Sequence, residues 1–134
     1  MKNVCATVLL ALLLVGVSGC DQAGDAGSSG SEPEVVHVVL IWLKQPGNSE
    51  HRQKLIKGLK ELRSIPLVQD VRVGQVIESD RPIVEDSYDV GLYLRFANKA
   101  DLQAYLAHPV HVDAVKNEFS PLMKRYRVMD FTSE

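Results

Sequence analysis

Apolar residues recur with two different periods along this chain, and the order of the periods predicts a mixed α and β domain over residues 35–134. Residues 35–43 form a continuous apolar run of strand length, rich in β-branched side chains, so both of its faces require burial. Apolar residues then follow at helical spacing over 50–64, and Pro66 ends this helix. Residues 71–77 alternate apolar and polar side chains, which predicts a strand with one wetter face.

The second half of the domain repeats this change of period. Residues 88–96 alternate as a third strand, and Asn98 with Asp101 three residues later is a capping signal for a second helix. A His-Pro-Val-His corner at 108–111 interrupts that helix, helical spacing then resumes, and 125–131 reads as a fourth strand. The order β-α-β-β-α-β predicts a ferredoxin-like α+β domain with four antiparallel strands and both helices on one face.

The first strand offers apolar side chains to both faces of this sheet, although the helices can cover only one. Val36, Val38, Leu40 and Trp42 point one way, and Val39, Ile41 and Leu43 point the other. An uncovered apolar sheet of this size marks a contact surface for a partner. We therefore predict a homodimer that packs sheet on sheet.

Residues 1–19 are predicted to be the signal peptide of a lipoprotein. Lys2 gives a basic start, and an apolar run over 4–17 follows. About 14 residues rise only ~21 Å as a helix, short of the ~30 Å hydrocarbon core of a bilayer. The closing Val-Ser-Gly-Cys is similar to the lipobox of bacterial lipoproteins, which implies cleavage before Cys20 and lipidation of that cysteine. The alternative is an ordinary secretory signal with an incidental cysteine.

Residues 20–34 are predicted to be the lipidated Cys20 and a flexible acidic linker. After Cys20 this segment has no large apolar side chain, four acidic groups and no basic one, so it cannot bury enough surface to order. The predicted location is the bacterial cell envelope, with the domain tethered to a membrane and facing the periplasm or the cell exterior. Whether that membrane is the inner or the outer one stays open.

Four motifs in this order carry a family resemblance. They are His37-Val-Val-Leu-Ile-Trp, Tyr88-Asp89, Tyr105-Leu-Ala-His108-Pro109-Val110-His111 and Val128-Met-Asp130-Phe131. With them the chain resembles the stress-responsive dimeric α/β-barrel (Dabb) family over residues 36–132. The resemblance implies a dimer whose two sheets form a barrel-like enclosure, and a cleft between sheet and helices in each subunit.

The same resemblance suggests candidate catalytic residues. In a plant member that is a polyketide cyclase, the working tyrosine and histidine fall on Tyr105 and His111. An N-terminal family histidine matches His37, whereas the position of a second cavity histidine is Val90 here. As a catalytic pair, His111 would act as a base and Tyr105 would stabilise an oxyanion. The alternative is that His111 only satisfies backbone groups where a helix starts.

Three further residues are candidates for lining a ligand pocket, namely His37, Tyr88 and His108. Each has a structural alternative: a hydrogen-bonded core histidine, a packing aromatic, and the end of a helix at the residue before a proline. A metal site from His108, His111 and Asp113 is a further alternative that we do not favour, because the proline disturbs the helical spacing such a site needs. We predict neither a metal nor a cofactor.

These patterns predict a membrane-anchored lipoprotein whose domain binds a small apolar or aromatic molecule in the cleft between sheet and helices. An acid–base enzyme of the cyclase or isomerase type, using Tyr105 and His111, is the alternative, and a pure interaction scaffold is a third. The formal net charge is −2, with 15 Lys and Arg against 17 Asp and Glu and no basic stripe. A nucleic-acid partner is therefore not expected.

Overall fold

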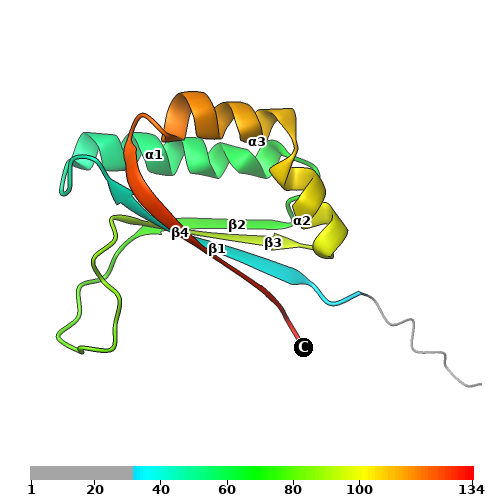
Figure 1. The fold of residues 1–134 in the computed structure, drawn as a ribbon, viewed down its shortest axis with the longest axis horizontal. Coiled ribbons are helices and arrows are strands. Elements are labelled where there is room, and N and C mark those ends of the chain that lie inside the picture. The colour runs from blue at the N-terminus through cyan, green and yellow to red at the C-terminus, as the bar shows by residue number, and fades with distance from the viewer. Residues whose placement is uncertain (1–31) are drawn as a thin grey trace, which may run out of the picture.

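The structure, a computed structural model, describes residues 32–134, so the predicted signal peptide and Cys20 lie outside the described residues. The elements are β1 (Val35–Leu43), α1 (Ser49–Glu61), the 3-10 turn η1 (Leu62–Ser64), β2 (Asp70–Gln75), β3 (Val90–Phe96), α2 (Lys99–Leu106), α3 (Pro109–Asp113), the π-helical η2 (Ala114–Phe119) and β4 (Met123–Thr132). The four strands form one antiparallel sheet in the order β2-β3-β1-β4, with the helices together on one face (Figure 1). The predicted ferredoxin-like α+β fold is confirmed.

Local capping starts the two longer helices. The Asn48 side chain accepts a hydrogen bond from the N–H of His51 at 3.0 Å, and Asn98 accepts from the N–H of Asp101 at 2.9 Å. The predicted start of the second helix is therefore confirmed. Within residues 32–134 none of the helices has the length and apolar character needed to cross a bilayer.

The core lies between the sheet and the helices. Antiparallel register sets Val39 of β1 beside Leu92 of β3, so alternate residues of both strands point to the helical side. The helices supply the facing layer, with Leu55 and Leu59 of α1 almost fully buried. Burial of each such side chain contributes about 1.5–3 kcal/mol, and this layer accordingly fixes how the helices sit on the sheet.

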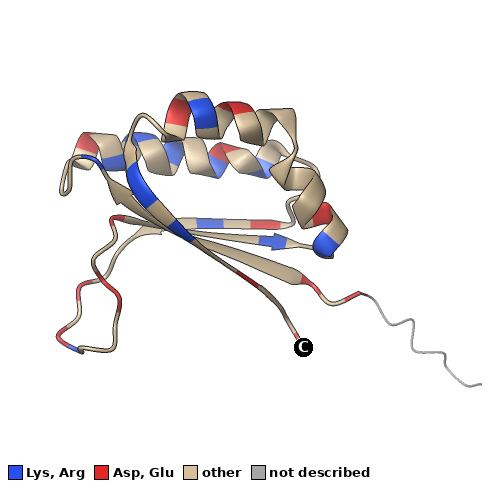
Figure 2. Ribbon diagram, in the orientation of Figure 1, with Lys and Arg blue, Asp and Glu red and all other residues tan. Residues whose placement is uncertain are grey.

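The opposite sheet face carries no helix. We call it the open face, and it consists of Val36, Val38, Leu40 and Trp42 of β1, with Asp70, Arg72, Tyr93, Arg95, Arg125, Arg127, Met129 and Phe131 of the neighbouring strands. Blue segments on β2, β3 and β4 mark its arginines in Figure 2. The face is therefore apolar along β1 and basic on both sides of it.

The fourth strand, β4, is longer than the predicted 125–131, whereas the predicted strands 71–77 and 88–96 each run two residues past the ladder between β2 and β3. The ladder between β2 and β3 closes where Gln75 pairs with Val90, so β2 stops before Ile77 and β3 starts after Tyr88. Ile77 is 83% exposed, because no strand lies beside it. Alternation of apolar and polar residues continues past both ends of the ladder, which is why the sequence pattern predicts strands that are too long.

Candidate functional site

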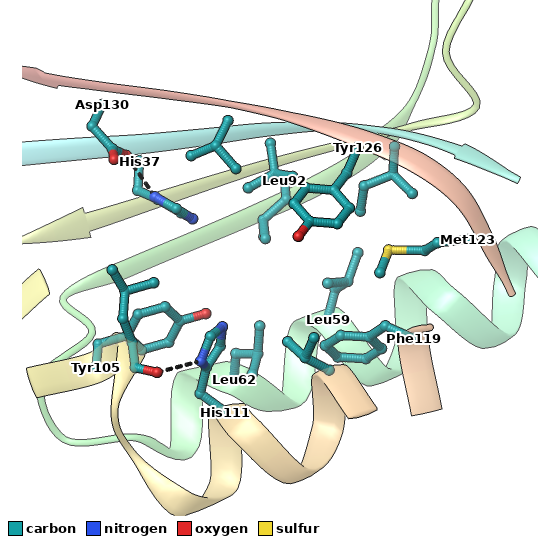
Figure 3. Close-up of a pocket in the computed structure, with 15 residues that line it drawn as sticks. His37, Leu59, Leu62, Leu92, Tyr105, His111, Phe119, Met123, Tyr126 and Asp130 are labelled. Carbon is teal, nitrogen blue, oxygen red and sulfur yellow. Dashed lines mark hydrogen bonds and ion pairs between the residues drawn. The ribbon is translucent and has the colours of Figure 1, made fainter. Parts of the chain in front are cut away.

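A cavity of about 320 Å³ lies between the sheet and the helices (Figure 3). Most of its wall is apolar and comes from both layers, including Val39, Ile41, Leu59, Leu62, Leu92 and Phe119. The polar groups at its surface are the side chains of His37, Tyr105, His111, Tyr126 and Asp130. A cavity of this size and character suits a small, mostly apolar molecule that makes a few directed hydrogen bonds.

The His-Pro-Val-His corner positions His111. Pro109 is the first residue of α3 and has no N–H, so α2 cannot continue through it. His108 caps α3, and its Nδ1 accepts a hydrogen bond from the N–H of Val110 at 3.3 Å. The carbonyl of Leu106 would need that N–H in a continuous helix, and here it accepts from Nδ1 of His111 at 3.1 Å.

This hydrogen bond also fixes the tautomer of His111. A carbonyl oxygen only accepts, so Nδ1 carries the hydrogen and Nε2 of the neutral ring keeps a lone pair. Figure 3 shows the second ring nitrogen pointing into the cavity. Burial lowers the pKa of His111; the hydrogen bond to Leu106 opposes this shift, and the charges of His37 and His108 add to it. His111 is therefore held as a neutral acceptor that faces the cavity.

Tyr105 stands beside His111 in the last turn of α2. Its ring centroid lies 4.4 Å from that of His111 and 5.0 Å from that of Phe96, and only 1% of the residue is exposed. Burial alone raises the pKa of Tyr105 far above its ordinary value. The phenol accordingly stays protonated, and its hydroxyl faces the cavity as a hydrogen-bond donor (Figure 3).

His37 enters the cavity from the sheet. Its Nδ1 donates to Oδ1 of Asp130 at 2.6 Å, across the β1–β4 pair in which the two residues stand opposite each other. The histidine is 5% exposed, whereas the carboxylate is partly open to solvent. A short hydrogen bond to a carboxylate is a strong one, and it orients Nε2 of His37 toward Tyr105 and His111 (Figure 3).

The structure thus brings together three of the five predicted site residues: Tyr105, His111 and His37. Tyr88 lies on the open face, where its ring packs edge-on against Trp42, because the chain leaves the ladder before β3 begins. His108 stands outside the cavity, because its side chain is used as the cap of α3. Neither Tyr88 nor His108, both predicted to line a ligand pocket, is among the residues that line this cavity.

Two cavity groups escape the sequence-based prediction, Asp130 and Tyr126 of β4. Both alternate with Val128 along the strand, so an acidic residue in an otherwise apolar alternation is the signal that could have indicated Asp130. Within residues 32–134 no three His, Cys, Asp or Glu side chains lie close enough to hold a metal ion. His108, His111 and Asp113 accordingly form no such cluster.

A family model described as Dabb, the stress responsive A/B barrel domain, matches residues 35–133. The chain belongs to this family. The match spans nearly all of the described residues and confirms the resemblance that the four motifs predict. No curated protein matches the chain.

Solved structures show the same fold. A Dabb family protein from Mesorhizobium loti with a ferredoxin-like fold is 23% identical, at a TM-score of 0.63, over 77% of this chain and 99% of its own. A hydroxynitrile lyase from Passiflora edulis is 21% identical, with a TM-score of 0.63, over 78% and 95%. A dimeric protein of unknown function from Bacteroides fragilis is 23% identical, with a TM-score of 0.59, over 75% and 96%. The Mesorhizobium chain therefore consists of little more than this domain.

Acidification is expected to destabilise this Dabb domain through His111. Its folded-state pKa lies below its unfolded value of about 6.5, so the unfolded chain binds more protons just below that pH. The free energy of unfolding therefore falls as the pH drops from about 6.5 to the folded pKa. Urea unfolding at several pH values should show that His111→Gln loses this part of the dependence. Parallel curves for the two proteins would contradict the assignment.

Proposed function

We propose that the Dabb domain binds a small aromatic or apolar molecule that carries a carbonyl oxygen. The observation that supports this most directly is the Tyr105 hydroxyl, a protonated donor inside an apolar cavity. A buried donor favours a ligand that supplies an acceptor, since leaving it unpaired costs about 1–3 kcal/mol. In this proposal the apolar wall contributes most of the affinity for the ligand, and the Tyr105 hydroxyl favours ligands whose carbonyl oxygen can accept its hydrogen bond.

Acid–base catalysis is a second candidate, favoured by the orientation of His111. Its Nε2 faces the same space as the Tyr105 hydroxyl, and the two rings lie 4.4 Å apart. A proton on the carbon next to a bound carbonyl could pass to Nε2 while the hydroxyl donates to the developing enolate oxygen. That the Passiflora relative is a lyase is compatible with this chemistry.

The binding proposal predicts that Tyr105→Phe lowers the affinity of the domain for a ketone and leaves its affinity for a matched hydrocarbon unchanged. With 2-acetylnaphthalene as probe, calorimetry on residues 32–134 should show roughly 3–10-fold weaker binding, the loss of one hydrogen bond of about 0.5–1.5 kcal/mol. The control probe is 2-ethylnaphthalene, which keeps the shape and lacks the oxygen. It should bind both proteins equally. Equal weakening of both probes, or no binding of either, would refute the role of Tyr105.

The catalytic candidate makes a separate prediction. In D₂O the methyl protons of bound 2-acetylnaphthalene should exchange for deuterium, and His111→Gln should slow this exchange roughly a hundredfold or more. NMR of the ketone measures the rate, and calorimetry shows whether the variant still binds. If wild type and variant exchange equally slowly while both bind, the domain is a binding module.

We further propose that the protein is a lipoprotein, anchored to a membrane of the bacterial envelope through Cys20. The support is the sequence of the N-terminal segment: an apolar run too short to span a bilayer, small residues before the cysteine, and an acidic linker up to β1. Each buried CH₂ of an acyl chain contributes about 0.8 kcal/mol, so two or three chains hold the domain at the membrane.

Globomycin, which blocks cleavage of lipoprotein signals, tests the anchor. Cells that express the full chain should accumulate a precursor under the drug, and the protein should sediment with membranes in its absence. The Cys20→Ala variant should show neither the drug-sensitive cleavage nor lipid labelling. Cys5→Ala is the matched control and should behave like wild type, because Cys5 lies within the predicted signal.

We also propose that the domain forms a homodimer through the open face of its sheet. The dimeric relative from Bacteroides fragilis supports this assembly, and so does the row of apolar side chains that β1 presents there. Sedimentation of residues 32–134 that gave a monomer at micromolar concentration would contradict it.

A further inference from the structure

The loop between β2 and β3, residues 76–89, projects from the sheet on the side away from the helices (Figure 1). We call residues 76–88 of it the arm. At this length a connection without secondary structure usually has a function of its own. It carries Ile77, two residues beyond the end of β2, and Ile83, near its middle. They are 83% and 84% exposed and are the most exposed large apolar residues of the described chain. Two isoleucine side chains exposed to water contribute no hydrophobic burial to the stability of a single domain.

The arm is fixed to the open face rather than free. Trp42 of β1 donates from its ring N–H to the Ser87 hydroxyl at 3.0 Å, and Tyr88 packs edge-on against the same ring. Across the arm, the N–H of Ser79 donates to Oδ2 of Asp86 at 2.9 Å. These contacts hold the arm in one position before any partner arrives, so docking it costs little conformational entropy.

The arm and the open face carry opposite charges (Figure 2). The arm has four carboxylates and one arginine: Glu78, Asp80, Glu85, Asp86 and Arg81. The open face has four arginines, of which Arg72 and Arg95 pair with Asp70 and Glu34. Within residues 32–134 Arg125 and Arg127 form no ion pair, and Arg125 lies 3.7 Å above the Trp42 ring.

A carboxylate of the arm already responds to these two cations. Hydrogen bonds from Ser87 lower the pKa of Glu85, and the guanidinium groups of Arg127 and Arg125 lower it further. The remaining carboxylates extend along the arm, beyond the sheet of their own subunit. The basic open face of another copy of the chain offers these carboxylates a second target.

We propose that the arm is a dimerisation arm, which lays Ile77 and Ile83 on the apolar row of a second copy's open face and sets its carboxylates against that copy's Arg125 and Arg127. The inference rests on the proposed homodimer and specifies what holds it. In a two-fold dimer both subunits make the contact, so four isoleucine side chains leave water. The helices and the cavity stay on the outside of the assembly.

The dissociation constant of the dimer tests the arm. Sedimentation of residues 32–134 should give a dimer, and the double variant Ile77→Ser with Ile83→Ser should raise the dissociation constant at least tenfold, since exposed isoleucines matter only where a contact buries them. The control is Val110→Ser with Val112→Ser, two half-exposed residues of α3 on the helical side, which should leave it unchanged. Added salt should weaken the wild-type dimer, because ion pairs contribute to it.

Cysteine accessibility provides an independent readout. Residues 32–134 contain no cysteine, so Ile83→Cys introduces a single thiol. Its alkylation by a maleimide should slow as protein concentration rises through the dissociation constant, whereas the thiol of Val112→Cys should react at one rate throughout. A wild-type monomer would overturn the homodimer itself. This inference would be overturned, and the homodimer retained, by two results together. The dissociation constant would be the same with and without the isoleucine substitutions, and the Ile83→Cys thiol would react at one rate at all protein concentrations.

Discussion

The site depends on one missing hydrogen-bond donor, the backbone nitrogen of Pro109. Its absence ends α2. Beyond the break the N–H of Val110 bonds Nδ1 of His108 and not the carbonyl of Leu106, so Nδ1 of His111 bonds that carbonyl instead, at 3.1 Å. The ring is thereby locked with Nε2 toward the cavity, beside Tyr105 in the last turn of α2. The structural role of His111 and the chemical role proposed for it are therefore compatible, because they use different ring nitrogens.

The central position of β1 connects this site with the rest of the domain. The strand pairs with β3 on one side and β4 on the other, and successive side chains serve opposite faces. His37 belongs to the cavity, while Trp42 of the same strand anchors the arm on the open face. A continuous apolar strand is needed here because neither face of β1 meets water freely, which explains why the run over 35–43 shows no alternation.

Element order is predictable from the sequence because period and capping are local properties, as the cap of α2 at Asn98 shows. Tyr105 and His111 come together for the same reason, since a single corner sets both. The contact of His37 with Asp130 spans 93 positions and depends on the register of β4 against β1, which no local pattern encodes. The position of Tyr88 outside β3 and outside the cavity is unpredicted for a related reason, because apolar alternation does not reveal where a ladder stops.

The edge strand β4 adds a physical link between the two faces of the sheet. It directs Tyr126 and Asp130 to the cavity and Arg125 and Arg127 to the open face, all from one backbone. The side chain of Asp130 is 44% exposed, yet it orients His37 through a bond of 2.6 Å. A second copy seated on the arginines would restrain the backbone that carries Asp130.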